Sequence, residues 1–306
     1  MPEPRHIFTG DPLDRSERER RDPTWLAKQL TLRSSKFLLF DSMRVLAERG
    51  PPTELFWLGP EARNLAAPGA EPFFLGVAEG VAHFALDATG HTHDVALLTG
   101  GRGQFEDPRK TAPHLTLPAT GLLAHAKSLV DWHARHQFCA NCGAPTVATT
   151  SGKERSCDNC GARHYPRTDP VAIMLVHDGE RCLLGRGNRR ASAFYTALAG
   201  FIDHGESIEE AVRREIYEEA GLEVGDVVYH SSQPWPFPAS LMVGCLAEAK
   251  TTDINFDTVE LEDVRWFDRS TVVETLSADR FATETLAIPG TIAIAQHLIK
   301  AWAFRE

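Results

Sequence analysis

The fold is decided by the stretch GFIDHGESIEEAVRREIYEEAGL, residues 200–222 of this 306-residue chain. Ser207 is a favourable helix N-cap, and Glu210 lies three residues later, as a capping box requires. Gly221 is typical of a residue that ends a helix. The stretch therefore predicts one helix between two loops, and the rest of the chain is interpreted outward from it.

The carboxylates of this helix follow its apolar face. At 100° per residue, Glu215 and Glu219 continue the face formed by Ile208 and Val212, with Glu218 at its edge. A run of charges usually covers a solvated face. Carboxylates on an inward face repel one another and are costly to desolvate, and Mg²⁺ or Mn²⁺ relieves both problems. The pattern predicts a divalent metal site.

Composition limits the class of protein. The length suits two or three domains, and 42% hydrophobic with 24% charged residues is typical of a globular protein. No apolar run approaches the ~20 residues that span a bilayer, so we expect no membrane segment. The polar first residues contain no secretion signal, so we expect a cytoplasmic protein. A net charge of −10 argues against a broad nucleic-acid surface but leaves room for local basic pockets.

The first part of the chain is predicted to be rich in strands. Residues 1–33 carry dense charges and are expected to form a solvated surface segment. Short apolar runs then predict strands at residues 36–40, 54–58, 72–77, 82–86 and 94–98. Residues 99–118 are expected to form a loop before a helix over 119–136. We expect the helix's His125, His133 and His136 to be surface or packing histidines.

Two C-x-x-C pairs follow, Cys139 with Cys142 and Cys157 with Cys160, and a glycine follows each pair. Such glycines allow the tight turns that direct both thiolates of a pair to one ion. The spacing predicts a zinc ribbon with four thiolates, in which the closed coordination makes the zinc structural. A redox pair, the alternative, usually involves a single C-x-x-C.

The last part of the chain is predicted to be an α+β sandwich. Strands are expected at residues 171–177, 181–184, 227–231, 240–249 and 264–267, with a closing helix over 291–303. The expected domains are an N-terminal β-rich domain with its linking helix (1–133), a zinc ribbon (134–167) and a third domain (168–306).

A second motif, SQPWPFPAS at residues 232–240, follows the box helix. Its alternating prolines predict a stiff, extended loop with few backbone donors. Trp235 and Phe237 between the prolines suit a platform for a flat base or pyridine ring. The plainer interpretation is a surface loop with two buried aromatic rings.

Three features together resemble a known family. Residues 200–222 match the Nudix box, G-x5-E-x7-R-E-U-x-E-E-x-G-U with U aliphatic, at every fixed position. The 232–240 loop, the ribbon and the β-rich start, in this order, resemble the NADH pyrophosphatase branch of the Nudix hydrolases. The resemblance covers nearly the whole chain. It implies a Nudix α/β/α sandwich preceded by the ribbon and the N-terminal domain, and hydrolysis of NADH or NAD⁺ to nicotinamide mononucleotide and AMP.

The resemblance also implies site residues. Cys139, Cys142, Cys157 and Cys160 would bind zinc, and Mg²⁺ or Mn²⁺ would be bound by Glu215, Glu218, Glu219, Glu260 and the Ala199 carbonyl. We expect Arg214 to orient the glutamates and to pair with Glu210, while Glu206 supports the loop or acts as an outer ligand. The substrate would be held by Tyr165, Gln233, Pro234, Trp235, Pro236, Phe237, Pro238, Ala239, Ser240 and Ala293. Arg102 is a further candidate.

Several alternatives stay open. The same bond is exposed in RNA that carries a 5′ NAD cap, so capped RNA is a second possible substrate. A broader ADP-ribose or nucleotide-sugar hydrolase is disfavoured by the 232–240 loop. A nucleic-acid-binding ribbon with a degenerate enzyme domain is disfavoured by the intact box and the acidic charge. Members of the family are dimers, so we expect a homodimer.

Overall fold

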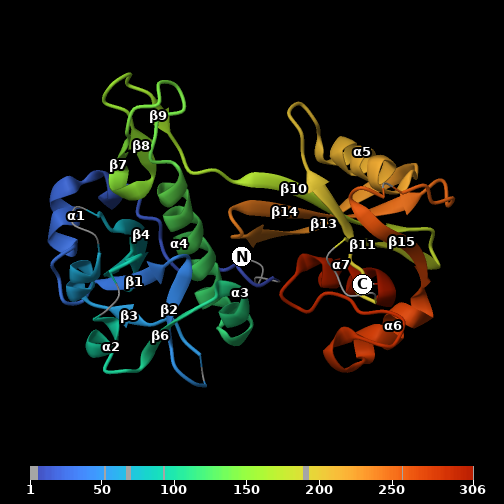
Figure 1. Ribbon diagram of the computed structural model, residues 1–306, viewed down its shortest axis with the longest axis horizontal. Coiled ribbons are helices and arrows are strands. Elements are labelled where there is room, and N and C mark those ends of the chain that lie inside the picture. The colour runs from blue at the N-terminus through green and yellow to red at the C-terminus, as the bar shows by residue number, and fades with distance from the viewer. Residues whose placement is uncertain are drawn as a thin grey trace. The chain divides into compact units, whose positions relative to one another are not determined.

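The computed structural model describes residues 6–305 except 52, 67–69, 92–93, 189–192 and 257. The chain forms two compact units: residues 1–168 with 235–239, and residues 169–234 with 240–306 (Figure 1).

The first unit contains a six-stranded sheet in the order β4-β5-β1-β2-β6, with β3 paired to β1. Its strands are β1 (Lys36–Asp41), β2 (Arg44–Glu48), β3 (Trp57–Leu58), β4 (Phe73–Ala78), β5 (Val81–Asp87) and β6 (Gly103–Glu106). One face packs with helix α1 (Pro23–Gln29) and the 3-10 helix η2 (Pro60–Leu65). The long helix α4 (Leu117–Arg135) packs on β1, β4 and β5. The predicted β-rich domain and its linking helix are confirmed.

Two local predictions in this unit are wrong, and one strand was missed. Residues 95–98 form a short helix, α2 (Val95–Leu98), and the exposed Leu97 and Leu98 show that this apolar run is not a buried strand. Strand β2 was not predicted. Residues 99–118 are not only a loop, since they contain β6, helix α3 (Pro108–Thr111) and the 3-10 helix η3 (Ala112–His114).

The expectation that the charged N-terminal segment is a solvated surface segment is wrong for part of it. Phe8, Leu13 and Arg20 are all buried, and a 3-10 helix, η1 (Glu19–Arg21), carries Arg20 inward. The Arg20 guanidinium donates to the carbonyls of Phe74 (2.6 Å) and Leu75 (3.2 Å). The charge pattern misled the prediction because an arginine can be buried when carbonyl oxygens accept from its two terminal nitrogens, as they do here.

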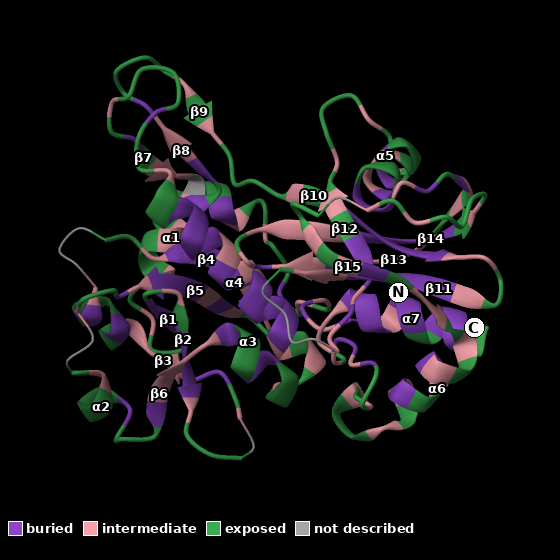
Figure 2. Ribbon diagram, turned by 45° about the vertical axis from the view of Figure 1, so that its right-hand side comes forward, coloured by how far each residue is buried: buried purple, intermediate pink, exposed green. Residues whose placement is uncertain are grey.

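The zinc ribbon follows α4 as a small sheet in the order β7-β8-β9. Its elements are β7 (Val147–Thr149), the 3-10 helix η4 (Thr150–Gly152), β8 (Glu154–Ser156) and β9 (Arg163–His164). Buried residues line the main sheets and the inward faces of the long helices, whereas the ribbon is largely exposed (Figure 2).

The second unit has a sheet in the order β13-β14-β10-β11-β15, with β12 paired to β10. Its strands are β10 (Asp169–His177), β11 (Arg181–Gly187), β12 (Leu198–Phe201), β13 (Val224–Trp235), β14 (Ser240–Ala249) and β15 (Leu261–Asp268). Helix α5 (Ile208–Ala220) covers one face, while α6 (Arg269–Ser277) and α7 (Ile294–Phe304) cover the other (Figure 1). The predicted α/β/α sandwich is confirmed, and α6 and the short β12 are additions to it.

The two large sheets share one topology. Strands β1 to β6 occupy the same places in the first sheet as β10 to β15 in the second, including the parallel pairs β1–β5 and β10–β14. Helix α5 lies between β12 and β13, and the corresponding position between β3 and β4 is held by the six residues of η2. The sequence analysis did not predict this duplication.

Candidate active site

Helix α5 is bounded as its sequence predicts. The Ser207 hydroxyl accepts a bond from the Glu210 N–H, and the Glu210 carboxylate accepts one from the Ser207 N–H at 2.7 Å. Gly221 ends the helix in the left-handed conformation. Ala211, Val212 and Ile216 are fully buried in the core, which fixes the rotation of the helix and hence the direction of its glutamates.

Arg214 is the hub of the glutamate cluster. Its guanidinium donates to Glu206 (2.6 and 2.8 Å), Glu215 (2.8 Å) and Glu218 (3.0 Å). A further bond reaches the Phe201 carbonyl at 2.9 Å. The expected partnership with Glu210 is wrong, because the Glu210 carboxylate serves the capping box. The pKa of Arg214 is raised, first of all by its bonds to Glu206.

Glu206 has both carboxylate oxygens engaged within this loop. Besides Arg214, it accepts a bond from the Asp203 N–H at 2.9 Å. The bond from Arg214 is the main reason that the pKa of Glu206 falls to about 2. This arrangement favours loop support over metal binding, so of its two expected roles the geometry supports the first.

Gly200 permits the close approach of strand β12 to helix α5. A Cβ atom at this position would lie 1.9 Å from the Glu215 carboxyl carbon, so no larger residue fits without displacing that carboxylate. The preceding residue, Ala199, pairs with Ile173 of β10. The backbone of β12 is thereby placed beside Glu215.

Glu219 is the most deeply buried carboxylate of the helix, with 8% of its surface exposed. Burial, followed by repulsion from Glu215, Glu260 and Glu218, raises its pKa to about 8. Its Oε2 atom has no hydrogen-bond partner among the described residues. Such an atom is costly to bury unless a cation or proton neutralises it.

These residues suit a hard divalent cation. Glu260 repels both Glu215 and Glu219, which places it in the same cluster, and all donors are oxygen atoms of the kind that Mg²⁺ and Mn²⁺ prefer. Among the described residues, only the four cysteines bring three or more ligand atoms within 4.8 Å of one another. The glutamate oxygens of the cluster, taken three at a time, lie farther apart than that. The unpartnered Glu219 oxygen is the feature that fits a bound ion.

One positioning residue was missed by the sequence analysis. The Asn188 carboxamide donates to the Val259 carbonyl at 2.8 Å, directly before Glu260. This bond joins the end of β11 to the turn that presents Glu260. No local pattern could have indicated it, since 71 residues separate the two partners.

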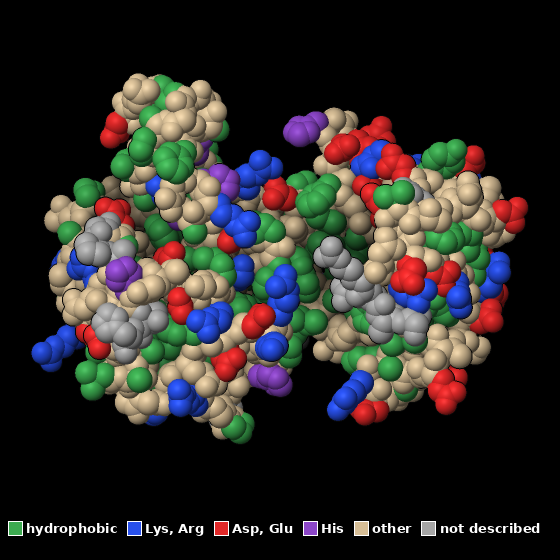
Figure 3. All heavy atoms as spheres, viewed as in Figure 1, with side chains coloured by type: hydrophobic (Ala, Val, Ile, Leu, Met, Phe, Trp, Pro, Cys, Tyr) green, Lys and Arg blue, Asp and Glu red, His purple; other side chains and the backbone are tan. Residues whose placement is uncertain are grey.

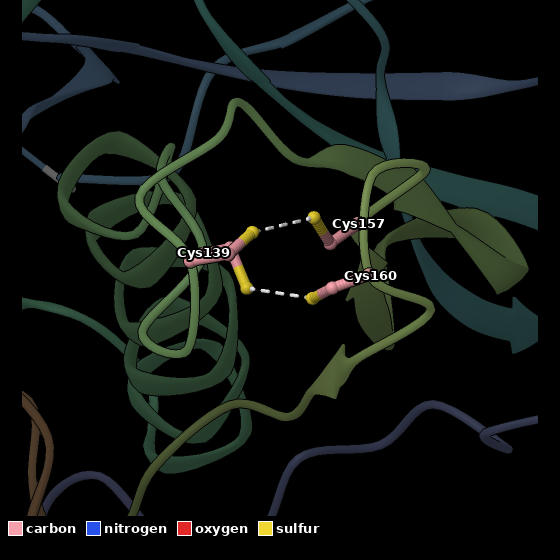
Figure 4. Close-up of side chains that lie close together, drawn as sticks. Cys139, Cys157 and Cys160 are labelled. Atoms are coloured by element: carbon pink, nitrogen blue, oxygen red, sulfur yellow. Dashed lines mark hydrogen bonds between the residues drawn. The ribbon is translucent and has the colours of Figure 1, made fainter.

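The four ribbon cysteines converge as predicted. The Sγ atoms of Cys139 and Cys160 lie 3.6 Å apart, and those of Cys142 and Cys157 lie 3.5 Å apart (Figure 4). Four thiolates around one tetrahedral zinc ion at 2.3 Å would be separated by about 3.8 Å. Gly143 and Gly161 adopt positive φ angles of 73° and 75°, which close the two knuckle turns. The sulfur atoms fit a zinc ion.

Residues 232–240 divide between strand and hairpin. Gln233 is fully buried within the second unit: its Nε2 donates to the Ile292 carbonyl and its Oε1 accepts the Ile294 N–H, both at 2.8 Å. These bonds anchor the start of α7 at its N-cap, Ala293. The Gln233 side chain therefore supports the backbone at Ala293, while Pro234 and Ser240 lie at the facing ends of β13 and β14.

Residues Trp235, Pro236, Phe237, Pro238 and Ala239 belong by their contacts to the first unit. The rings of Trp235 and Phe237 pack edge-on against Phe8 at 5.9 and 5.7 Å. The Arg109 guanidinium lies 3.8 Å above the Phe237 ring, and the Lys127 ammonium lies 5.1 Å from it. The hairpin is thus a packed aromatic surface with cations on one side.

A basic cavity adjoins this hairpin. It has a volume of about 400 Å³ and is lined by Phe237 and Pro238 together with Arg44, Arg109, Lys127 and Arg135. Asp107 and Asp131 also line it. Several Lys and Arg side chains are visible on this unit despite the acidic net charge (Figure 3). Arg102, the basic candidate expected from the sequence, does not line this cavity; it lies over Phe56 and 4.0 Å from Glu48.

Comparisons with known proteins agree with this architecture. The family model described as NUDIX domain matches residues 166–286, NADH pyrophosphatase zinc ribbon domain matches 134–165, and NADH pyrophosphatase-like rudimentary NUDIX domain matches 34–132. The human NAD-capped RNA hydrolase NUDT12 is 35% identical over 97% of this chain and 73% of its own length. The chain belongs to the NADH pyrophosphatase branch of the Nudix hydrolases.

Two further relatives carry related names. The NAD-capped RNA hydrolase NudC of Mycobacterium bovis (strain BCG / Pasteur 1173P2) is 36% identical over 81% of this Nudix hydrolase and 80% of the relative. The human mitochondrial NAD(P)H pyrophosphatase NUDT13 is 39% identical over 73% of this chain and 65% of the relative. The rudimentary domain named by the family model is the first unit's sheet, which explains the shared topology of the two sheets.

The remaining substrate candidate of this Nudix hydrolase is Tyr165, which follows β9 at the exit of the zinc ribbon. Its ring is 58% exposed and has the Arg163 guanidinium 5.9 Å from its centre. An exposed aromatic ring beside a cation can stack on a base. No helix in the described part of the Nudix hydrolase is long and apolar enough to cross a membrane.

Proposed function

We propose that this enzyme hydrolyses the pyrophosphate bond of NADH or NAD⁺ to nicotinamide mononucleotide and AMP. The observation that carries the proposal is the buried Glu219 carboxylate with its unpartnered oxygen, set beside Glu215, Glu218 and Glu260. Membership of the NADH pyrophosphatase branch supports the substrate class.

Glu215, Glu218, Glu219 and Glu260, with the Ala199 carbonyl, are proposed to hold Mg²⁺ or Mn²⁺. When bound, the ion neutralises the diphosphate and lowers the pKa of an attacking water. Arg214 and Glu206 keep the box loop against the helix, so they act as positioning residues. Positioning and charge stabilisation then account for most of the rate, as in other phosphoryl chemistry.

The substrate is proposed to be held by Tyr165, by residues Gln233 to Ser240 and by the Ala293 backbone. Exposed and half-buried rings at Tyr165 and Trp235 suit the flat groups of a dinucleotide. Gln233 would act through the start of α7, since its amide nitrogen donates to the Ile292 carbonyl and its amide oxygen accepts from the Ile294 N–H. Arg109 and Lys127, above the Phe237 ring, would attract phosphate groups.

Capped RNA is the second candidate substrate. Two of the relatives described above are named NAD-capped RNA hydrolases. The basic cavity beside Phe237 favours this candidate, because it offers cations for phosphates beyond the cap in a chain that is otherwise acidic.

A substrate panel tests the proposal. NADH, NAD⁺, ADP-ribose and NAD-capped RNA would each be incubated with Mg²⁺ or Mn²⁺, and the release of AMP or of 5′-monophosphate RNA measured. We expect metal-dependent cleavage of the NAD-type substrates and weak cleavage of ADP-ribose. Equal turnover of ADP-ribose would contradict the assigned specificity. Steeper inhibition by salt for capped RNA than for NADH would support a role of the basic cavity.

Three further proposals accompany the activity. We infer that residues 1–133, 134–167 and 168–306 act as the N-terminal domain, structural zinc ribbon and Nudix domain, which limited proteolysis would test. We propose a homodimer on the family resemblance, to be measured by light scattering. We also propose a cytoplasmic location, because none of the six cysteines, all of which the structure describes, forms a disulfide, and this suits a reducing compartment. Cell fractionation would test it.

A further inference from the structure

The rudimentary domain contains a cavity that the proposed activity does not use. It lies in the first unit, has a volume of about 330 Å³ and is bordered by β3, β5 and the start of α4. Trp57 and His83 form part of its wall, with their rings edge to face at 5.0 Å. Both rings are only half-buried, so each has surface left for a ligand.

The place of this cavity in the fold corresponds to the proposed substrate corner of the second unit. Helix α4 packs on β1, β4 and β5, and α7 packs on β10 and β14, their counterparts in the second sheet. In the second unit the N-terminus of α7 meets β13 through Gln233 and Ala293. In the first unit the matching corner, between Ala78 at the end of β4 and Thr116 at the start of α4, is the cavity.

Of the features of the second unit, the first unit retains this corner but, among its described residues, has no α-helix that corresponds to the box helix α5. The segment that replaces α5 is the 3-10 helix η2, and its only acidic residue, Glu61, caps the N–H of Gly59 at 2.9 Å. The first unit therefore has no counterpart of the glutamate cluster in its described η2 segment. What remains is a concave site with aromatic walls, which is suited to binding and not to hydrolysis.

The lining defines the class of ligand. No Lys or Arg is among the described residues that line the cavity, and Glu54 adds a carboxylate to it, so a diphosphate would find repulsion there and no fixed cation. Thr116 makes no side-chain cap, which leaves backbone donors at the start of α4, and Thr53 adds a hydroxyl. The volume is at the small end of ligand pockets, which suits one flat ring system and not a whole dinucleotide.

We propose that the cavity between β3, β5 and α4 is a second binding site, which takes the uncharged, flat base of a nucleoside between Trp57 and the start of α4. The inference rests on the cavity, its aromatic walls and the shared topology. The choice of a nucleoside base rests on the proposed substrate corner of the second unit, whereas the binding test below does not require hydrolysis.

The test uses the full-length enzyme and nucleosides, which have no pyrophosphate bond and are not consumed. The indole N–H signals of the six tryptophans would be recorded by NMR, and the Trp57 signal assigned with Trp57→Phe. Adenosine, nicotinamide riboside and uridine would then be titrated. We expect a saturable shift of the Trp57 signal, at least tenfold weaker binding in His83→Ala, and unchanged NADH hydrolysis by His83→Ala.

A Trp57 signal that does not move at millimolar nucleoside overturns the proposal, even if the Trp235 signal shifts through binding elsewhere. Equal affinity in wild type and His83→Ala also overturns it. If circular dichroism shows that His83→Ala does not fold, the nucleoside titrations of the wild type and of His83→Gln replace it, with the same Trp57 shift and the same loss of affinity as the test. Absence of NADH hydrolysis by the wild-type enzyme, with the Trp57 shift intact, would instead contradict the proposed activity alone.

Discussion

At the scale of single residues, the proposed active site depends on one guanidinium. Arg214 joins Glu206 of the box loop to Glu215 and Glu218 of helix α5 and also binds the Phe201 carbonyl. A planar group with five donors can serve all four acceptors at once, whereas an ammonium group cannot reproduce that geometry.

Arg214→Lys is expected to keep the charge and lose the orientation of the glutamates. We expect kcat to fall by about ten- to a hundredfold, as for other residues that orient metal ligands. Steady-state kinetics and Mn²⁺ binding by electron paramagnetic resonance would measure the change. Arg213→Lys is the matched control, because Arg213 donates only to the Glu209 and Gly225 carbonyls in the described structure. Equal loss in both variants would contradict the role of Arg214.

Glu219→Gln is expected to reduce turnover by roughly a thousandfold or more while the protein stays folded, because a charged metal ligand is replaced by a weak neutral one. Burial raises the pKa of Glu219 to about 8, so in the metal-free protein at neutral pH a mostly neutral carboxyl is replaced by a neutral amide, and the melting temperature should not fall. Glu209→Gln, an exposed position on the same helix, should behave as wild type. Near-normal activity of Glu219→Gln would refute the assignment.

At the scale of elements, α4 is tied to the zinc ribbon through His133. Its Nε2 donates to the Gly152 carbonyl at 2.8 Å, its Nδ1 accepts from Arg155 at 3.0 Å, and its ring stacks on Phe73 at 3.9 Å. This pattern assigns the neutral tautomer. Burial lowers the pKa of His133 to about 4. The sequence-based expectation of a packing histidine describes this residue well.

The pKa of His133 predicts a loss of stability in mild acid. The unfolded chain takes up a proton on His133 near pH 6.5, and the folded protein does so only near pH 4. The stability that depends on neutral His133 is therefore fully present above pH 6.5 and is lost as the pH falls from 6.5 to 4. We expect the free energy of unfolding to fall by about 1 kcal/mol more between pH 7 and 5.5 in wild type than in His133→Gln. Urea unfolding with excess zinc would measure this difference. The exposed His114→Gln should leave the wild-type pH dependence unchanged.

The ribbon itself is expected to depend on its metal. Cys157→Ser should lower the zinc content from one ion per chain to near zero and reduce stability by several kcal/mol, which is roughly 10 °C in Tm. Elemental analysis and calorimetry would measure both quantities. Asp158→Asn, exposed in the same knuckle, should retain zinc. Unchanged zinc content in Cys157→Ser would contradict the four-thiolate site.

At the scale of the whole molecule, one fold has been used twice with different outcomes. The second unit keeps the long box helix and its glutamates, and the first unit keeps the sheet and its covering helix but has a short 3-10 helix instead. The two candidate metal sites also differ in their ligands: the first unit offers four thiolates and the second unit a cluster of carboxylates.

This separation predicts two responses to chelation. Brief treatment with EDTA should abolish activity, because carboxylates bind Mg²⁺ weakly and exchange it readily, whereas zinc held by four thiolates should remain. Adding Mg²⁺ or Mn²⁺ should restore activity without added zinc. The assay is NADH turnover together with zinc content before and after treatment. Recovery that requires zinc would place zinc in the catalytic step and refute the division.

Much of the fold and part of the candidate site could be predicted because the signals are local. The capping box of α5, the alignment of its glutamates with the apolar face and the paired knuckles all depend on residues a few positions apart. Helical periodicity and turn geometry convert such spacing directly into structure. Strand β2 was missed, and the helix at residues 95–98 was predicted to be a strand. Both failures arise because a short apolar run does not reveal whether it is buried or which of its faces is buried.

By itself, the sequence determined the box helix, the zinc ribbon and the family. Only the tertiary structure decided that Arg214 pairs with Glu206 and not Glu210, that Asn188 supports the turn before Glu260, and that Arg109 lies over Phe237. It also revealed the duplicated sheet. For Asn188 and Arg109 the physical reason is distance along the chain, because their partners are brought to them by the packing of strands and helices far apart in sequence. For Arg214 it is the path of the box loop, which brings Glu206 to the guanidinium from eight residues away while the capping box engages Glu210.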